Sequence, residues 1–199
     1  MATKTYLAGR KTYARPQGIL LSNNQGYRDT DGSYIPDGYE GTDFIVLSDH
    51  NRSPLSLTNT RIESRRRMVN GTMRSYFTAD KANLSISWNL LPSRSFSDNV
   101  ARSDDGLIVP PRPPAELPHE YTVDGGAGGV DLKKWHDDHP GPFFVFLAYD
   151  RYDKMYTDVY NKLDKYNDRL HMYFSSFDWS VETRHTCELW NVSLNLEEV

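Results

Sequence analysis

A short acidic segment carries oxygen-bearing side chains at a spacing typical of calcium-binding loops. The segment DTDGSYIPDGYE covers residues 29–40. The side chains at positions 1, 3, 5, 9 and 12 of such a loop are Asp29, Asp31, Ser33, Asp37 and Glu40. This spacing can wrap oxygen ligands around one hard cation, but the sharp turn needs glycine at position 6, where the chain has Tyr34. The sequence therefore favours a Gly/Asp-rich surface loop, with a calcium site as the alternative.

A second polar group, WHDDHP, lies at the end of an expected helix. His136 and His139 are three positions apart, so both imidazoles can reach one cation from the same helical face. A zinc site would need a further ligand from elsewhere in the chain, whereas polar side chains at a helix end are usually solvated. We therefore expect a solvated helix end and no metal at this position.

The chain contains no recognisable catalytic motif. Its single cysteine, Cys187, precedes an expected strand without neighbours suggestive of a nucleophile, so a buried structural thiol is favoured. The sequence has no G-x-S-x-G, P-loop, dinucleotide-binding glycine pattern or H-E-x-x-H. We expect a protein that is not an enzyme and that needs no cofactor.

A charged segment surrounds an Asn-Gly pair, which is a strong signal for a hairpin turn. Asn70 and Gly71 separate two polar-rich strands, expected over residues 57–69 and 72–79. The charged residues of these strands are Arg61, Glu63, Arg65, Arg66, Arg67 and Arg74. We expect this hairpin to lie at a subunit interface or along a channel, with most arginines paired to carboxylates of the same or an adjacent subunit. DNA contact is the alternative, and the net charge of −4 disfavours it.

Several other segments show the alternation or the apolar runs of β-strands. In the last of them Trp190, Val192, Leu194 and Leu196 share one face, so they are expected core residues. A turn is expected at TADKAN, residues 78–83. Helices are expected at 130–141, with Asp131 as the cap, and at 152–165, where a tyrosine-rich loop is the alternative. Strands are expected at 18–22, 43–48, 84–89, 142–150, 176–182 and 188–197.

Two long segments lack regular patterns. Residues 1–43 read as an N-terminal arm with loops, and residues 92–129 as a Pro/Gly-rich insertion that contacts neighbouring subunits. The chain has 199 residues, 13% aromatic residues and one cysteine. No apolar run reaches the length of a membrane span. These features predict a single mainly β domain, a β-sandwich or barrel with one or two short helices packed alongside, made in a cytoplasm and independent of membranes.

Two stretches together resemble tail proteins of tailed bacteriophages. The first is RIESRRRMVNGTMRSYFTADKANLSISWNLLPSR at residues 61–94, where R-M-x-N-G-T-x-R is followed by A-D-K and a Ser-Trp strand. The second is the closing hairpin FSSFDWSVETRHTCELWNVSLNLEEV at residues 174–199. They cover about 60 of the 199 residues. The chain is most similar to a tail tube, or major tail, protein.

This resemblance implies a virion structural protein, made in the host bacterium, that assembles with itself and with other tail proteins. In such tails six-membered rings stack into a tube, a β-hairpin from each subunit helps to form a continuous inner barrel, and DNA passes through without being held. The alternatives are a distal-tail or baseplate hub protein, a head–tail connector, and a carbohydrate-binding or hydrolytic tail module. Particle mass separates a monomeric module from a tube, and release of sugars or peptides from host envelopes would identify a hydrolase.

Overall fold

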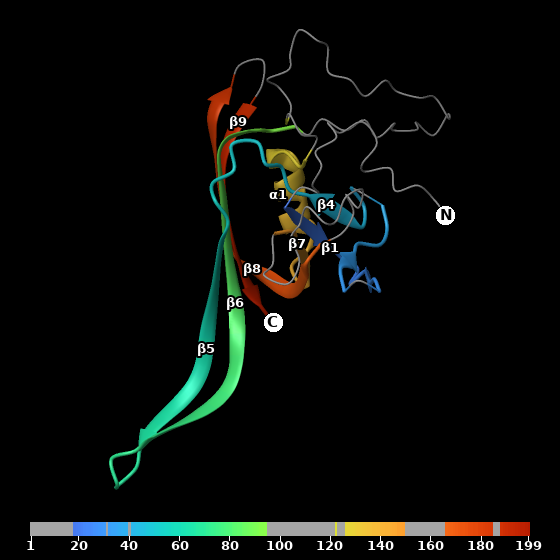
Figure 1. The fold of residues 1–199 in the computed structure, drawn as a ribbon. Coiled ribbons are helices and arrows are strands. Elements are labelled where there is room, and N and C mark those ends of the chain that lie inside the picture. The colour runs from blue at the N-terminus through green and yellow to red at the C-terminus, as the bar shows by residue number, and fades with distance from the viewer. Residues whose placement is uncertain are drawn as a thin grey trace.

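The computed structural model describes residues 18–30, 32–39, 41–94, 122, 126–149, 166–184 and 188–199. Within these ranges the protein is mainly β, with a single short helix packed alongside, as expected from the sequence (Figure 1). The elements are β1 (Ile19–Ser22), β2 (Tyr27–Arg28), β3 (Tyr34–Ile35), β4 (Phe44–Val46), β5 (Ser56–Arg67), β6 (Met73–Pro92), α1 (Gly129–Asp138), β7 (Phe143–Leu147), β8 (Asp168–Arg184) and β9 (Glu188–Glu198).

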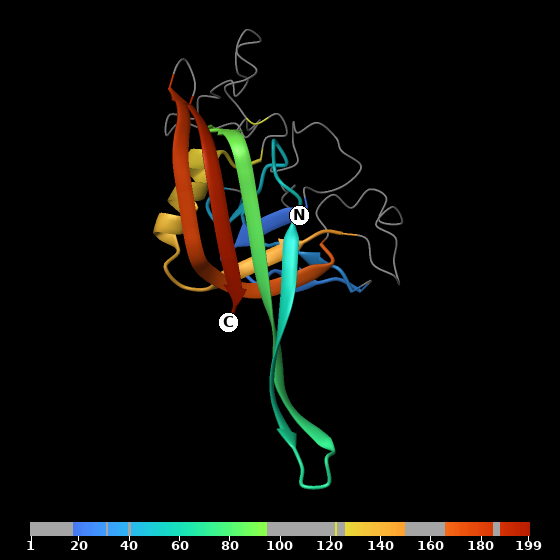
Figure 2. The ribbon, with the colours of Figure 1, turned by 90° about the vertical axis from the view of Figure 1, so that its left-hand side faces the viewer.

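Seven strands form one antiparallel sheet in the order β4-β1-β7-β8-β9-β6-β5, and β2 pairs with β3 separately. The two ends of this sheet remain apart, so the described strands do not close into a barrel. β8 joins two halves of the sheet, because it pairs with β7 through residues 168–172 and with β9 through residues 172–184. The half that contains β1, β4 and β7 lies, with α1, on one side of the long strands (Figures 1 and 2).

The core lies between the long strands and this second layer. Alternate residues of β6 and β9 point into it, which confirms the period of two seen in the sequence. From the other side the core receives α1 and the buried strands β1 and β7, which confirms the apolar runs expected as strands. The buried residues contributed by β6 and β9 include Leu84, Ile86, Trp88, Trp190, Val192, Leu194 and Leu196.

Helix α1 begins at Gly129, two residues before Asp131, which was the expected N-cap. Gly128 is the N-cap, and Asp131, at the third helical position, accepts a hydrogen bond from the Gly128 backbone N–H at 2.9 Å. The carboxylate therefore reaches back to the cap instead of occupying it, as in a capping box. Gly129 lies so close to Trp190 that a Cβ there would be 2.7 Å from the indole. This contact anchors the helix against β9.

The expected turn at residues 78–83 is wrong, because β6 runs without a break from Met73 to Pro92. Asp80 and Lys81 have low β-propensity, but each lies opposite a β5 residue in the ladder, and pairing overrides local preference. The ladder between β5 and β6 contains one β-bulge, where the register shifts between Ile62 and Glu63. The hairpin around the Asn-Gly pair and the closing hairpin of β8 and β9 are confirmed.

Some expected features fall outside the described residues. These include residues 1–17 of the arm, most of the insertion at 92–129, the segment 152–165 and Cys187. Within the range expected to form the arm, Ile19–Ser22 forms the buried strand β1. Across the described ranges, α1 is too short and too polar to be a transmembrane segment.

Candidate assembly surface

The outer parts of β5 and β6 extend beyond the rest of the sheet as a two-stranded ribbon (Figures 1 and 2). β6 pairs with β9 only from Asn83 onward, so residues 73–82 pair with β5 alone. We call residues 59–82 the ribbon. All eight residues expected at an interface or channel lie on it, and the hairpin brings them together. A two-stranded hairpin by itself is marginally stable in water, so this length of ribbon needs further contacts.

The tip of the ribbon is a tight turn that begins at Met68. Its backbone N–H donates to the Thr72 carbonyl at 2.8 Å, and the Gly71 N–H donates to the Met68 carbonyl at 2.9 Å. Gly71 has a φ of 80°, a left-handed conformation that favours glycine. The Asn70 side chain accepts hydrogen bonds from the backbone N–H and hydroxyl of Thr72 at 3.1 and 2.7 Å. The Asn-Gly pair therefore closes the hairpin, as expected from the sequence.

Two arginines of the ribbon form ion pairs with carboxylates of the ribbon itself. Arg61 forms an ion pair with Asp80 at 3.2 Å, and its guanidinium lies 5.5 Å from the centre of the Phe77 ring. The Arg65 Nε donates to the Glu63 carboxylate at 2.6 Å. The Ser75 hydroxyl also donates to that carboxylate, and this hydrogen bond, followed by that of Arg65, lowers the pKa of Glu63 below its ordinary value.

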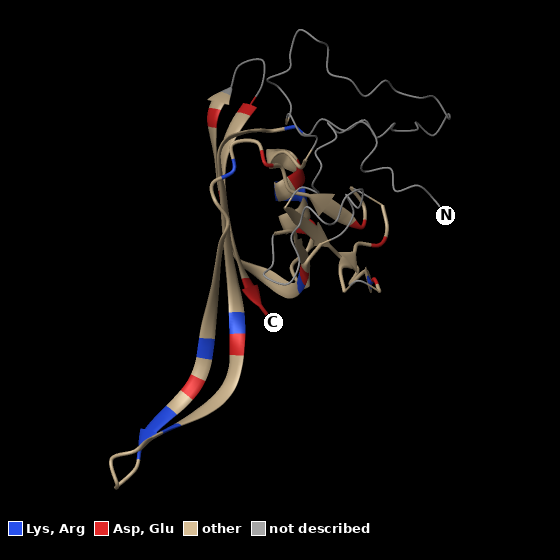
Figure 3. Ribbon diagram, viewed as in Figure 1, with Lys and Arg blue, Asp and Glu red and all other residues tan. Residues whose placement is uncertain are grey.

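The end of the ribbon carries an excess of positive charge (Figure 3). Arg66 lies directly opposite Arg74 in the ladder, and Arg67 lies opposite Met73. No carboxylate within the described ranges forms an ion pair with these three arginines. Like charges that face each other across a ladder are destabilising, so this pair needs an anionic group from outside the ribbon.

Exposed apolar side chains accompany the arginines. Phe77 is 60% exposed, Met73 57% and Tyr76 56%. Aromatic residues, methionine and arginine are the residue types enriched at protein–protein interfaces. Side chains alternate along β6, so Tyr76 lies on the opposite face from Met73 and Phe77, and both faces of the ribbon expose apolar side chains. The full set of large apolar residues exposed on the ribbon is Ile62, Met68, Val69, Met73, Tyr76 and Phe77.

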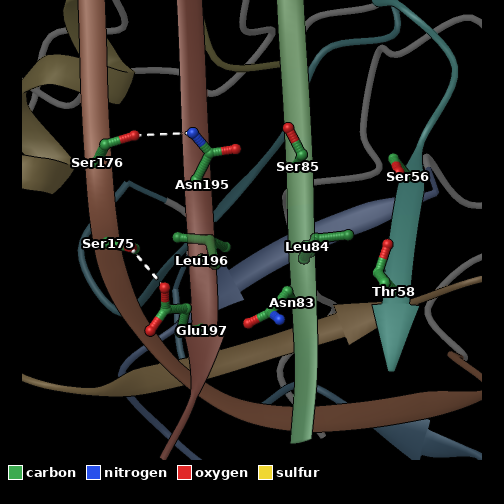
Figure 4. A pocket seen from close by; sticks show the side chains of 10 residues that line it. All are labelled: Ser56, Thr58, Asn83, Leu84, Ser85, Ser175, Ser176, Asn195, Leu196 and Glu197. Atoms are coloured by element: carbon green, nitrogen blue, oxygen red, sulfur yellow. Dashed lines mark hydrogen bonds between the residues drawn. The ribbon is translucent and has the colours of Figure 1, made fainter. Parts of the chain in front are cut away.

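A different surface lies where the ribbon joins the sheet, on the side of the long strands away from α1. It contains a shallow groove of about 310 Å³ that crosses β5, β6, β9 and β8 (Figure 4). Hydroxyl and amide side chains line most of it, and they bond to one another across the strands. The Asn195 amide donates to the Ser176 hydroxyl at 2.8 Å, and the Ser175 hydroxyl donates to Glu197 at 2.8 Å. Sequence reasoning missed this groove, although the repeated Ser and Asn at alternate positions were visible.

The acidic segment at residues 29–40 follows β2 directly and contains β3, which pairs with β2 in a short hairpin. The Asp29 carboxylate accepts the Thr30 N–H at 2.7 Å, and the Asp37 carboxylate accepts the Gly38 N–H at 3.0 Å. Both carboxylates therefore stabilise turns by accepting hydrogen bonds from the backbone. Ser33 accepts the Asp29 N–H through its carbonyl. The other two candidate calcium ligands, Asp31 and Glu40, lie outside the described residues, so the structure does not test the calcium alternative.

The two histidines of α1 pack against aromatic rings. The His136 ring stacks on Phe177, with centroids 4.8 Å apart, and the His139 ring stacks on Trp135 at 3.8 Å. His139 Nδ1 also lies 2.7 Å from the Trp135 carbonyl oxygen. Among the described residues, no group of three or more His, Cys, Asp or Glu side chains could hold a metal ion. His136 therefore helps to pack α1 against β8, and His139, at the C-cap, lies beside Phe143 of β7.

Comparison with known proteins finds similarity to solved structures but no sequence match. No protein-family model and no curated protein matches the chain. Among solved structures, the chain is similar to one from the tail of an empty GTA particle with C6 symmetry, at 9% identity and a TM-score of 0.36. The similarity covers 87% of this chain and 95% of that chain. This structural similarity is too low to indicate a function for this chain.

Proposed function

We propose that the protein is a structural protein of a phage-like virion tail, most similar to a tail tube protein, and that it assembles through the ribbon. The observation that carries this proposal is the ribbon itself. It combines unpaired strand edges, exposed aromatic and methionine side chains, and arginines without carboxylate partners. Each of these features is unfavourable in a monomer and favourable once a neighbouring subunit covers it.

The unpaired edges suggest how neighbouring copies join. In a monomer, residues 73–81 of β6 present one row of backbone groups that no other strand pairs with, and β5 presents another along the opposite side. Closing a ring lets identical subunits satisfy such edges without leaving any free, because each copy offers one edge and receives another. A homo-oligomeric ring, six-membered by the resemblance of the sequence to tail proteins, is the assembly that we propose.

We also propose that the arginines of the ribbon serve the assembly rather than DNA. Arg61 and Arg65 already have carboxylate partners within the ribbon. We propose that carboxylates of an adjacent subunit pair with Arg66, Arg67 and Arg74. Stacked rings would then form a conduit that lets DNA pass without specific binding, and the protein would have no catalytic role.

Electron microscopy of matched variants tests the proposal. Phe77→Asp places a charge on the ribbon, whereas Tyr39→Asp places one at an equally exposed aromatic residue, 67% exposed, in the β3–β4 connection. The parent protein and Tyr39→Asp should form rings or tubes in negative stain, and Phe77→Asp should remain a folded monomer by circular dichroism and light scattering. A parent protein that stays monomeric, or Phe77→Asp tubes of normal length, would refute assembly through the ribbon.

A DNA titration separates the tube from the head–tail connector, which would grip DNA. We expect intact assemblies to bind duplex DNA weakly near physiological salt, because their arginines are paired. Tight binding that weakens steeply as salt rises would indicate many phosphate contacts and would favour the connector.

A further inference from the structure

The turn at the end of the ribbon contains the only Asn-Gly pair of the chain. Gly71 has no side chain to shield its backbone nitrogen, and a Cβ placed there would meet no atom of the described, non-adjacent residues within 4 Å. Residues 68–72 are all exposed, so water and hydroxide can reach the turn. An asparagine side chain can react with the following backbone nitrogen by closing a five-membered ring, and glycine leaves that nitrogen the most accessible. The turn therefore holds a reactive pair at the exposed end of the ribbon.

Two hydrogen-bond donors of Thr72 are directed at the amide oxygen of Asn70. The Thr72 N–H donates to Asn70 Oδ1 at 3.1 Å, and the Thr72 hydroxyl donates to the same oxygen at 2.7 Å. Both bonds polarise the side-chain carbonyl, and both donors lie where negative charge develops on Oδ1 when a nucleophile attacks Cγ. Fixed donors at a developing oxyanion accelerate acyl transfer. Thr72 therefore prepares the Asn70 amide for attack by the Gly71 nitrogen.

One hydrogen bond opposes this attack. The Gly71 N–H donates to the Met68 carbonyl at 2.9 Å, and this bond must open before the nitrogen can react. It lies at the tip of a hairpin that no other described strand supports, and hydrogen bonds in such places open at a low free-energy cost. The positive charges of Arg66, Arg67 and Arg74 around the turn then favour the deprotonated nitrogen and the oxyanion.

We propose that Asn70 is a site of spontaneous deamidation, with Thr72 as the donor to the oxyanion, and that the reaction places a carboxylate among the arginines at the end of the ribbon. Hydroxide takes the Gly71 N–H proton, the nitrogen bonds to Asn70 Cγ, and the carbonyl electron pair moves to Oδ1. The electron pair then returns, the Cγ–Nδ2 bond breaks, and the amide nitrogen leaves as ammonia with a proton from water. The resulting succinimide is opened by water at either carbonyl, which leaves an aspartate or an isoaspartate at position 70. Overall a water molecule enters, ammonia leaves, and nothing is oxidised or reduced.

The new carboxylate changes the charge of the ribbon where its cations are concentrated. Arg67 and Arg74 flank the turn, and Arg66 lies opposite Arg74 in the ladder. A carboxylate between them offsets the repulsion of these like charges and lowers the net positive charge of the tip. Deamidation therefore makes the end of the ribbon less cationic as the protein ages. The reaction takes place in the unassembled chain, and the inference does not depend on the proposed function.

Peptide mapping of the aged protein tests the proposal. Unassembled protein is kept at mildly alkaline pH, and trypsin then cuts after Arg67 and Arg74 to release residues 68–74. The internal control is Asn59, an exposed residue of the same ribbon that is followed by threonine and lies in the tryptic peptide 53–61. Mass spectrometry and labelling by an isoaspartyl methyltransferase should show loss of most of the unmodified 68–74 peptide and a gain of isoaspartate. The 53–61 peptide should stay unmodified over the same time.

Variants of the turn separate the effect of the folded structure from that of the Asn-Gly sequence. Thr72→Ser keeps the hydroxyl and should react at the parental rate, whereas Thr72→Val removes it and should react several-fold more slowly, with both variants folded by circular dichroism. Equal rates in these two variants would overturn the role of Thr72. In isoelectric focusing the aged parent should shift to a more acidic position, and Asn70→Gln should not. A 68–74 peptide that stays unmodified, or an equal shift in Asn70→Gln, would overturn Asn70 as the site.

Discussion

Truncation of Trp190 should destabilise the monomer more than any change on the outward face of β9. The indole is 5% exposed, stacks on Trp179 with ring centroids 4.7 Å apart, and touches the start of α1 at Gly129. Trp→Ala changes in cores cost about 3–5 kcal/mol. We expect a loss of about 4 kcal/mol for Trp190→Ala, because Trp179 of β8 and the start of α1, which both contact the ring, belong to paired or helical backbone and leave little freedom to fill the cavity.

Equilibrium urea unfolding measures this loss, in dilute protein that has not assembled. Far-UV circular dichroism is the suitable probe, because the substitution removes one of four tryptophans. The matched control is Ser193→Ala on the opposite face of the same strand, which should cost less than about 0.5 kcal/mol. A Trp190→Ala loss below about 2 kcal/mol, or one equal to that of Ser193→Ala, would refute the packing described for β9 and α1.

Three further predictions concern the helix and the ribbon. Gly129→Ala should destabilise the monomer by about 1–3 kcal/mol in the same urea assay, because its Cβ would overlap the Trp190 ring. Asp131→Ala should cost about 1 kcal/mol through loss of the capping box. In an NMR titration, Glu63 should show a pKa below its ordinary value, and Ser75→Ala should raise that pKa by removing the main hydrogen bond. Because the folded-state pKa is lowered, the stability contributed by Glu63 should be present above its ordinary pKa and lost as pH falls through the lowered value.

Each of these predictions has a contrary result. Val130→Ala, at the exposed next position of the helix, should lower the stability far less than Gly129→Ala. An equal loss for the two variants would show that contact with Trp190 does not explain the effect of Gly129→Ala. An unchanged stability for Asp131→Asn would be compatible with capping, since an amide oxygen can also accept the bond, whereas an unchanged stability for Asp131→Ala would exclude it. A Glu63 pKa that stays the same in Ser75→Ala would show that the Ser75 hydrogen bond does not form in solution.

Local patterns in the sequence were enough to predict most strands and the buried face of the last one. Alternation along β9 depends only on which side of a strand faces water, so Trp190 and its alternating partners could be assigned to the core without any knowledge of the fold. The Asn-Gly turn depends on a backbone conformation that few residues adopt, so Gly71 identified the hairpin equally well. The prediction of where α1 starts was less accurate, because a carboxylate can cap a helix either from the N-cap position or from the third helical position.

The tertiary structure decided what depends on pairing between distant segments. The sequence around Asp80 indicates a turn, but the ladder with β5 keeps β6 extended for its full length. Only the register places Arg66 opposite Arg74, and only the sheet order brings β5, β6, β9 and β8 side by side to form the groove. Periodicity indicates whether a residue faces water or core, whereas strand partners and their register are set by contacts far apart in the chain. These long-range contacts formed both the ribbon and the groove.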